Sequence, residues 1–325
     1  MSHEIGTDVN QTQITSLSHI KGQPHIVELL RTSLDAYFAN RANNSSSSFG
    51  PVLMVGPSGT GKTLTAKAIH CELGNLQLIE SNGEMLNPTE LTSMLLMADE
   101  NSSIFVDEAQ ALDARTQHVL LTALSERKVI LPKRKNNKKT CSVPLANFTI
   151  ILATTHEFQL QNALRNRMRL CCRFNYYSAD DLTYIVKQRA DALKWDYENS
   201  EVLHEIAKRA KQTPRIALNR NLQMAWSVCS ADGRNVITKE DVCKAFDLLD
   251  IDEEGLDTLD QAYLCELSKR NSMKLNVLSS KLGLPSRTIS SVIEPYLLRQ
   301  ELIEKQGSER QITEKGKQHI SQNLQ

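Results

Sequence analysis

The sequence predicts an α/β domain with a parallel sheet covered by helices on both faces, then a helical domain and a C-terminal winged-helix domain. Three observations predict this order. In the first half of the chain, short apolar runs alternate with helical segments, which is typical of a parallel sheet with crossover helices. After about residue 178 the segments are helical in succession. The last part holds three helical runs and two short extended runs around a polar turn.

The α/β domain is predicted over residues 17–177, after a tail over residues 1–16 that we expect to be disordered. Apolar runs bounded by glycine or polar residues predict its buried strands, and periodic apolar residues between them predict its helices. In chain order we expect a helix within 19–41, a strand at 51–56, a helix at 61–74, a strand at 76–83, a helix around 90–100, a strand at 102–109, a helix at 119–128 and a strand at 147–155.

The rest of the chain divides at an acidic, glycine-containing connector, IDEEGLDTL. The helical domain is predicted over residues 178–250, and the winged-helix domain over 251–325. In the helical domain we expect helices at 180–195, 200–211, 214–230 and 238–250. In the winged helix we expect helical runs at 260–270, 274–282 and 286–299.

The composition is that of an ordinary globular protein. Lys and Arg number 38, as do Asp and Glu, so any electrostatic attraction to nucleic acid must come from local patches rather than from net charge. The seven cysteines show no C-x-x-C spacing, which argues against a zinc site or a disulfide framework. The polar N-terminus and the lack of a long apolar run predict a cytoplasmic protein that neither spans nor binds a membrane.

A glycine-rich segment, GPSGTGKT from Gly56 to Thr63, matches the phosphate-loop pattern G-x-x-x-x-G-K-[ST]. It follows an apolar run and precedes a helix, which is the context that the motif needs. Glycines such as Gly59 and Gly61 let successive backbone N–H groups point at phosphate oxygens, and the helix N-terminus adds its positive dipole end. Lys62 is expected to neutralise the β- and γ-phosphates, and Thr63 to bind Mg²⁺.

Two further strand ends carry candidate catalytic groups. Asp107 and Glu108 end the run IFVDE, where Asp107 can hold the Mg²⁺ shell and Glu108 can orient and deprotonate a water. Taken alone, this acid pair would be interpreted as an exposed helix start. Thr154 and Thr155 end the run ILATT, where a hydroxyl near the γ-phosphate could position that water.

Several arginines could contact nucleotide. Arg165, Arg167 and Arg169 lie in ALRNRMR, and an arginine that reaches a neighbouring subunit's γ-phosphate would stabilise the transition state. For any one of them alone, a solvated basic turn is the better interpretation. Arg215 lies just inside a predicted helix start after Pro214, where it opposes the helix dipole and so indicates an anionic partner.

These motifs, in this order, resemble those of an AAA+ ATPase. The segments TPRIALNR, IDEEGLD and VIEPYLLRQELIE resemble the RuvB family, the Holliday-junction branch-migration motors, over residues 17–320. The resemblance implies an AAA+ P-loop domain, a helical lid and a winged helix that binds DNA. It also implies ATP and Mg²⁺ as cofactors, and a homo-oligomeric, hexameric ring that uses ATP to move duplex or branched DNA in recombination and repair.

The resemblance also implies roles for individual residues. Residues of the phosphate loop and of the turn after it are implied to contact phosphate and Mg²⁺, and the acid pair is implied to contact the metal and the water. Three further residues are implied to contact the γ-phosphate: one at a strand end, one in the lid, and an arginine of a neighbouring subunit. The implied residues are Gly59, Gly61, Lys62, Thr63 and Leu64 for phosphate and Mg²⁺, Asp107 and Glu108 for metal and water, Thr155 as sensor 1, Arg167 as the finger given in trans with Arg165 as the alternative, Tyr177 for nucleotide, Arg215 as sensor 2, and Lys305 and Arg310 for DNA phosphates.

The chain departs from the family pattern at a few positions. Thr12-Gln13-Ile14 replaces a leucine–arginine–proline segment, which removes one nucleotide contact. His156 stands where an arginine usually follows the two threonines, and Ser308 interrupts the basic cluster of the wing. Met168 and Arg169 replace the phenylalanine and glycine after the finger. The chain is therefore identified as a divergent member with complete ATPase motifs.

Three functions agree with these motifs. The first is an ATP-driven DNA translocase or helicase of the RuvB type, the second is an AAA+ remodeller or loader that acts on a protein, and the third is an ATP-gated DNA-binding switch with slow hydrolysis. The complete acid pair argues against the third, and the winged helix favours DNA over a protein substrate.

A basic block, LPKRKNNKKT, lies between the acid pair and the two threonines. Extended segments on both sides predict a β-hairpin insertion at about 128–146, with the asparagines at its turn. In RuvB-like proteins this hairpin contacts the junction-binding partner RuvA, largely through apolar side chains. Here Lys133, Arg134 and Lys135 make the tip basic, which indicates DNA phosphate or an acidic protein surface as its partner, with a solvated turn as the alternative.

Overall fold

The computed structural model describes residues 6–12, 14–43, 48–131 and 141–323. It divides into two compact units, one of residues 12–181 and the other of residues 1–11 and 182–325. No helix in the described ranges has the length and apolar character needed to cross a membrane.

The unit of residues 12–181 is built on a five-stranded sheet with the strand order β2-β3-β6-β1-β7. All of its strand pairs are parallel. The strands are β1 (Val52–Val55), β2 (Gln77–Asn82), β3 (Ser102–Asp107), β6 (Thr149–Thr154) and β7 (Leu170–Arg173). Because all five strands run the same way, their C-terminal ends meet at one edge, which is where ligands bind in open α/β sheets.

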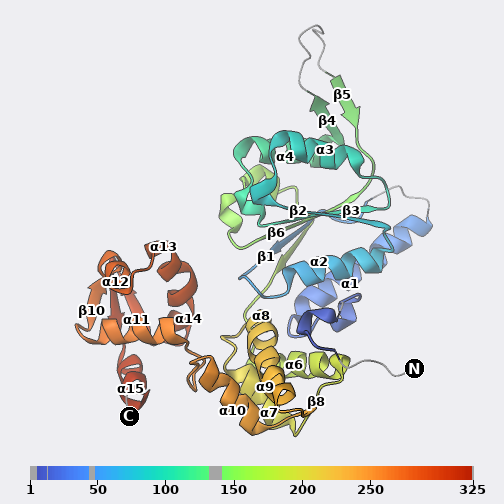
Figure 1. Cartoon of the computed structure of the whole chain (residues 1–325). Coiled ribbons are helices and arrows are strands. Elements are labelled where there is room, and N and C mark those ends of the chain that lie inside the picture. Colours follow the sequence, from blue (N-terminus) through green and yellow to red (C-terminus); the bar gives the residue numbers. More distant parts are fainter. Residues whose placement is uncertain (1–5, 13, 44–47, 132–140, 324–325) are drawn as a thin grey trace. The chain divides into compact units, whose positions relative to one another are not determined.

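Helices cover both faces of this sheet, as the buried apolar runs predict. The α-helices are α1 (Pro24–Ala42), α2 (Lys62–Leu73), α3 (Pro88–Met97), α4 (Ala114–Glu126) and α5 (Asn162–Arg165). Short 3₁₀ turns are η2 (Leu17–His19), η3 (Gly83–Met85), η4 (Ala109–Ala111) and η5 (Glu157–Gln159). Figure 1 shows α3 and α4 on one side of the sheet and α1 and α2 on the other.

The side chains of successive strand residues pack into two separate hydrophobic cores. In β1, Leu53 packs with residues of α3 and α4, whereas its neighbours Val52 and Met54 pack with α1 and α2. Adjacent side chains of a strand point to opposite faces, so a strand that is apolar at every position needs cover on both sides. This is why the uninterrupted run VLMV forms a central strand.

The predicted hairpin insertion is present at its base. β4 (Lys128–Leu131) pairs with β5 (Cys141–Pro144) in an antiparallel ladder outside the main sheet. The tip, including Lys133, Arg134 and Lys135, lies outside the described residues.

The second unit begins with a helical lid. It contains α6 (Ala179–Leu193), which starts in the first unit, then α7 (Ser200–Lys208), α8 (Pro214–Ile216), the π-helical turn η6 (Ala217–Leu222), α9 (Gln223–Ala231) and α10 (Lys239–Leu248). Two short strands, β8 (Asp196–Tyr197) and β9 (Val236–Ile237), pair in parallel between the helices.

The N-terminal residues differ from the disordered tail that the sequence predicts. Residues 6–11 pack on the lid and include the 3₁₀ turn η1 (Val9–Gln11). Val9 is only 1% exposed, its N–H donates to Oε1 of Gln223, and the indole of Trp195 donates to the carbonyl of Gly6. Low hydrophobicity predicts disorder for this segment, but one buried valine and several backbone hydrogen bonds are sufficient to hold it.

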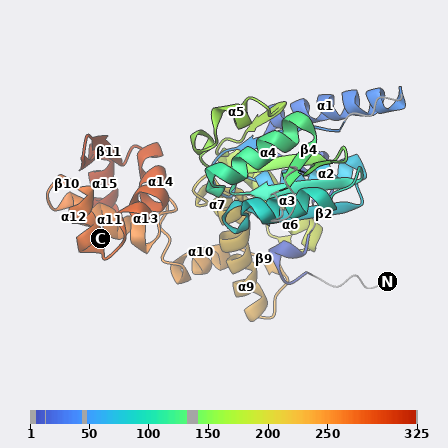
Figure 2. The same cartoon turned by 90° about the horizontal axis from the view of Figure 1, so that it is seen from above.

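The winged helix follows. Its elements are α11 (Thr258–Ser268), β10 (Ser272–Lys274), α12 (Leu275–Leu282), α13 (Ser286–Thr288), the π-helical turn η7 (Ile289–Ile293), α14 (Glu294–Arg299), β11 (Ile303–Gln306), β12 (Glu309–Ile312) and α15 (Glu314–Asn323). The small sheet has the order β10-β12-β11, and Figure 2 shows the helices gathered around it. The expected helices and wing strands are present, together with β10 and α15, which the sequence analysis did not anticipate.

Candidate nucleotide-binding site

The phosphate loop connects β1 to α2 at the C-terminal edge of the sheet. Gly59 and Gly61 adopt left-handed backbone with φ of 78° and 99°, which glycine adopts without steric cost. Gly61 is the residue that precedes α2, and Leu64 in the first turn of α2 is 40% exposed. The loop therefore has the backbone freedom that a ring of inward-pointing N–H groups requires.

The side chain of Lys62 lies across this loop. Its ammonium donates to the carbonyl oxygens of Gly56 and Pro57, both at 2.8 Å, and the residue is 7% exposed. A buried ammonium must be paired or hydrogen-bonded, and these two carbonyls provide the bonds. The charge is thus held where the loop would enclose an anion.

Thr63 and Asp107 meet beside the loop. The Thr63 hydroxyl donates to Oδ2 of Asp107 at 3.0 Å, although the two residues lie 44 positions apart. Parallel pairing of β3 with β6, and of β6 with β1, brings the end of β3 to the same edge as the loop. Hydroxyl and carboxylate oxygens are the ligands that Mg²⁺ prefers, completed by water and substrate phosphates. Among the described residues no group of three His, Cys, Asp or Glu side chains could hold a metal by itself.

Glu108 follows Asp107 in a constrained turn. Its φ is 47°, in the left-handed region that non-glycine residues rarely adopt. The Glu108 N–H donates to Oδ1 of Asp107 at 2.9 Å. A Cβ built on Gly83 would lie 2.4 Å from the carbonyl oxygen of Glu108. Gly83 is therefore needed for the close approach of these two backbones, and the turn at Glu108 is fixed from two sides.

Gln110 joins the acid pair to the strand end at Thr154 and Thr155. Its amide nitrogen donates to Oε2 of Glu108 and, at 3.1 Å, to the hydroxyl of Thr155. Its amide oxygen accepts from the hydroxyl of Thr154 at 2.6 Å. Sequence reasoning missed Gln110, because nothing in IFVDEAQ shows that the fourth residue of the turn faces another strand.

The hydroxyl of Thr155 also contacts its neighbour in the chain. Nδ1 of His156 lies 2.8 Å from Thr155 Oγ1, and Oε2 of Glu108 lies 3.5 Å from it. The His156 backbone N–H donates to Thr154 Oγ1 at 3.0 Å. Glu108, Gln110, Thr155 and His156 thus form one connected network.

The structure distinguishes two of the three arginines after this network. Arg165 donates to Oδ1 of Asn162, approaches Glu157 at 3.7 Å, and lies over the ring of Phe158 at 5.0 Å. By contrast, the Arg167 side chain is exposed. Arg165 is therefore engaged inside its own chain, and Arg167 is presented to solvent.

Tyr177 is buried against the loop. Its hydroxyl donates to the carbonyl of Thr60 at 2.9 Å, and a Cβ on Gly22 would lie 2.5 Å from its ring. Burial raises the pKa of Tyr177 to about 12, so the phenol stays neutral. Tyr177 therefore anchors the phosphate loop through the carbonyl of Thr60. The sequence predicts a nucleotide contact for Tyr177 and does not predict this structural contact.

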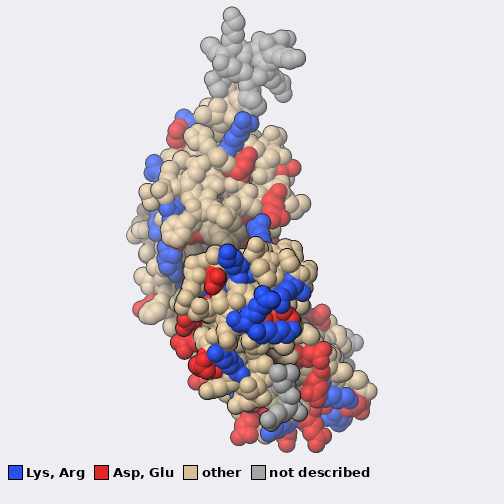
Figure 3. Space-filling view, turned by 90° about the vertical axis from the view of Figure 1, so that its left-hand side faces the viewer, with Lys and Arg blue, Asp and Glu red and all other residues tan. Residues whose placement is uncertain are grey.

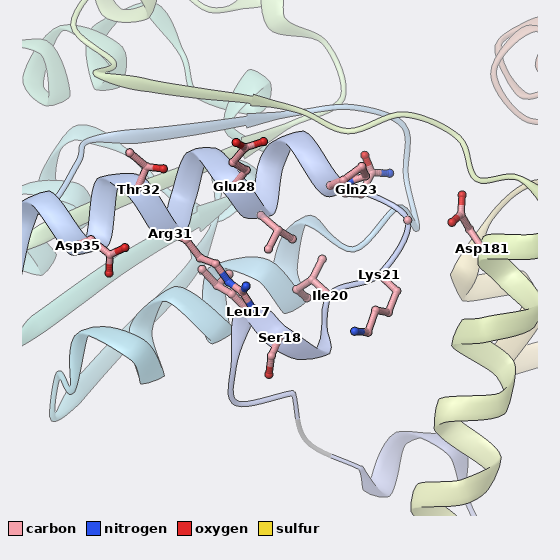
Figure 4. A pocket seen from close by; sticks show the side chains of 13 residues that line it. Leu17, Ser18, Ile20, Lys21, Gln23, Glu28, Arg31, Thr32, Asp35 and Asp181 are labelled. Carbon is pink, nitrogen blue, oxygen red and sulfur yellow. The ribbon is translucent and has the colours of Figure 1, made fainter.

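A cavity of about 540 Å³ lies along α1 and the turn before it. Figure 4 shows Leu17, Ser18, Ile20 and Arg31 around it, with Asp181 at one end. Its lining includes no residue of the loop from 56 to 63. The chemistry of the phosphate loop therefore lies outside this cavity.

Arg215 lies on α8 in the lid unit, directly after Pro214 at the helix start, and its side chain is exposed.

The two predicted DNA contacts of the wing have different surroundings. Arg310 is 8% exposed, and its guanidinium donates to Glu294 at 2.8 Å. This burial does not fit a contact with DNA phosphate, because the charge is already paired inside the domain; Arg310 instead links β12 to α14. Lys305 also pairs with Glu294, at 2.7 Å, but its side chain is 37% exposed.

The chain surface carries both signs of charge. Figure 3 shows Lys and Arg side chains beside Asp and Glu side chains, with uncharged surface between them. This agrees with the zero net charge of the sequence.

Comparison with known proteins gives matches along most of the chain, from residue 13 to residue 321. Family models match residues 13–174 as the Holliday junction DNA helicase RuvB P-loop domain, 177–252 as the RuvB AAA lid domain, and 253–321 as the RuvB C-terminal winged helix domain. The Holliday junction branch migration complex subunit RuvB of Streptococcus uberis is 33% identical over 288 residues, which cover 87% of this chain and 85% of that protein.

Two further relatives agree. The RuvB subunit of Kosmotoga olearia is 30% identical, over 96% of this chain and 92% of its own length. The solved structure of the Thermotoga maritima RuvB Holliday junction branch migration motor superimposes with a TM-score of 0.80 at 27% identity, over 94% of this chain and 97% of that one. These matches and the geometry of the phosphate loop lead to one conclusion: the chain belongs to the RuvB family of AAA+ ATPases.

Proposed function

We propose that this protein is a DNA-translocating ATPase of the helicase class that moves Holliday junctions during branch migration. The observation that supports this most directly is the convergence of Lys62, the Thr63–Asp107 pair and the Glu108–Gln110–Thr155 network at one sheet edge. The chain's relatives are named for branch migration of Holliday junctions, and the winged helix supplies a fold that commonly binds DNA.

The phosphate loop would bind ATP. Its backbone N–H groups and the α2 N-terminus provide positive partial charge for the β- and γ-phosphates, and Lys62 adds a full charge. Lys62 now bonds to two loop carbonyls, so phosphate oxygens would replace partners that are already oriented toward the loop. Gly59, Gly61 and Leu64 complete this segment, and Arg215 of the lid is proposed to sense the γ-phosphate.

Thr63 and Asp107 would hold Mg²⁺ together with the phosphates. When bound, the ion supplies neutralisation of the charge on the transferred phosphoryl group. Glu108 is then the general base that orients and deprotonates the attacking water. Gln110 holds the Glu108 carboxylate, and Thr155 offers a hydroxyl beside it.

We propose Arg167, rather than Arg165, as the finger that reaches the ATP of a neighbouring subunit. The exposure of Arg167 and the contacts of Arg165 with Glu157 and Phe158 support this choice. A finger given in trans implies that hydrolysis requires an oligomer, for which a hexameric ring is proposed. Lys305, as the exposed cation of the wing, is proposed to contact DNA phosphate, and a RuvA-like protein is proposed as a partner of the hairpin.

The primary test measures ATP hydrolysis and junction migration by the full chain. Wild type should hydrolyse ATP faster with junction DNA than without it, and the stimulation should weaken as salt is raised. Lys62→Ala and Glu108→Gln should each reduce turnover to near background. Turnover that is unchanged in Glu108→Gln, or that ignores DNA, would contradict the proposed motor.

The trans finger has its own test, which mixes two inactive proteins. Arg167→Ala lacks the finger but keeps its own ATP site, whereas Lys62→Ala keeps the finger but lacks a working site. Mixed rings should regain turnover, because some sites then combine an intact Lys62 with a neighbour's Arg167. Arg165→Ala is the control and should retain turnover without mixing. If instead Arg167→Ala keeps turnover by itself, while Arg165→Ala is inactive alone and is rescued by Lys62→Ala, Arg165 is the finger.

A further inference from the structure

The hydroxyl of Thr155 has one proton to donate and two possible hydrogen-bond acceptors. A hydroxyl donates once and accepts twice. Gln110 already donates to Thr155 Oγ1, at 3.1 Å. The remaining neighbours are Nδ1 of His156 at 2.8 Å and Oε2 of Glu108 at 3.5 Å. The proton therefore points either at the imidazole or toward the catalytic carboxylate.

The protonation state of His156 decides between these two arrangements. In the neutral tautomer that carries its proton on Nε2, the lone pair on Nδ1 accepts the Thr155 proton, whereas an imidazolium donates from both nitrogens and can accept nothing. Protonation of the ring therefore turns the hydroxyl away from it.

We propose that His156 is a positioning residue for ATP hydrolysis, whose protonated ring directs the Thr155 hydroxyl toward Glu108 and the γ-phosphate of bound ATP. This rests on the ATPase activity proposed above and adds a specific pH dependence to it. In the chemistry of this site, the redirected hydroxyl stabilises either the attacking water or the developing phosphoryl charge, and both act on turnover rather than on nucleotide binding.

The other charged groups near His156 do not reproduce this behaviour. Glu157, the next residue, donates nothing when ionised, and its hydrogen bond with Arg173 holds its pKa below the usual range. Arg173 and Arg165 are permanent cations, and both lie within 4.0 Å of Glu157. Loss of the negative charge of Glu108 would have the opposite effect, because it would remove the proposed base and lower turnover.

A purely structural role of the histidine side chain is separable from this one. The backbone N–H of His156 donates to Thr154 Oγ1, and every side chain at this position keeps that bond. The imidazole itself is exposed, so replacing it removes no core packing. Substitution therefore changes the orientation of the Thr155 hydroxyl while leaving the strand end anchored.

The experiment measures kcat at saturating ATP with the full chain and the same junction DNA, from about pH 5.5 to about pH 9. The wild-type kcat should fall about two- to tenfold as pH rises, since the protonated fraction of His156 falls. That range corresponds to about 0.4–1.4 kcal/mol in the barrier, which is the net value of one hydrogen bond. The ADP dissociation constant should not change with pH over the same range.

Three variants separate the possibilities. His156→Arg places a donor-only cation at the position and should keep kcat high without the fall. His156→Ala removes the competing acceptor and leaves Glu108 as the partner of the Thr155 hydroxyl, so it should give a high kcat with no fall. His118→Arg is the matched control, since His118 is exposed on α4 outside the network, and it should keep the wild-type profile. The NMR titration of the His156 ring should share its midpoint with the wild-type kcat profile.

Each outcome has a definite meaning. A wild-type pH profile that persists in His156→Arg or His156→Ala overturns the proposal, as does a ring titration whose midpoint differs from that of kcat. If instead wild type hydrolyses no ATP at any pH, or Glu108→Gln keeps full turnover, the ATPase proposal itself fails. Both failures can be read from the same set of samples.

Discussion

Gln110 should couple Glu108, the proposed general base, to Thr155, and Gln110→Leu tests this most directly. Leucine has a similar size but removes the amide bonds to Glu108, Thr155 and Thr154. A hydrogen bond to a charged group is worth about 1.5–3 kcal/mol. If the Glu108 bond acts fully in the transition state, losing it lowers kcat about 10- to 150-fold.

The same substitution should also reduce stability. Thr154 is 0% exposed, and its hydroxyl would lose the acceptor that it now reaches at 2.6 Å. An unsatisfied buried polar group costs about 1–3 kcal/mol, which should appear in the free energy of unfolding measured with urea. Nucleotide affinity should stay near wild type, because Lys62 and Thr63 are untouched.

Steady-state ATP hydrolysis, ADP binding and urea unfolding together give the answer. Ser102→Ala is the matched control. Ser102 is a buried hydroxyl at the other end of β3, where it donates to Asp99 at 2.6 Å. Its loss should cost similar stability without lowering kcat. If Gln110→Leu keeps kcat within about twofold of wild type, the network does not position Glu108 and the reasoning is refuted.

Three further predictions concern the lid and the winged helix. Glu294→Gln should reduce the free energy of unfolding by about 3 kcal/mol, because it leaves the charge of the buried Arg310 unpaired. Burial favours the neutral form of Glu294, but hydrogen bonds from Arg310 and Lys305 hold the Glu294 pKa low. Wild type should therefore lose stability below about pH 4.5, and the variant should not show this loss. A hydrogen bond to Asp252 raises the pKa of His319. The stabilisation that this pair gives the folded state is therefore complete below about pH 6.5 and is lost as pH rises through the folded-state pKa. His319→Gln should abolish that loss in urea titrations, and an unchanged pH profile of stability would show that the pair does not stabilise the fold. Removing residues 1–11 should lower stability by about 2 kcal/mol through loss of the buried valine, and an unchanged melting temperature would contradict the observed packing.

Much of the fold and of the candidate site could be predicted because the signals are local in sequence. Glycines and a lysine at fixed spacing specify a phosphate loop within eight residues, and an apolar run at every position requires a strand that is covered on both faces. The C-terminal ends of parallel strands meet at one edge, so the sequence alone predicts that Asp107 lies near Thr63. The two meet at 3.0 Å.

The tertiary structure alone decided which side chains face one another across the chain. Gln110, in the turn after β3, contacts Thr155 at the end of β6, and Arg310 is buried against Glu294 rather than exposed on the wing. Val9 is buried in a segment whose composition predicts disorder. Composition and spacing give the charge of a residue and the secondary structure around it, but not its partner, because burial depends on where distant segments pack. Whether a cation binds a ligand or holds its own domain together is therefore settled only by the fold.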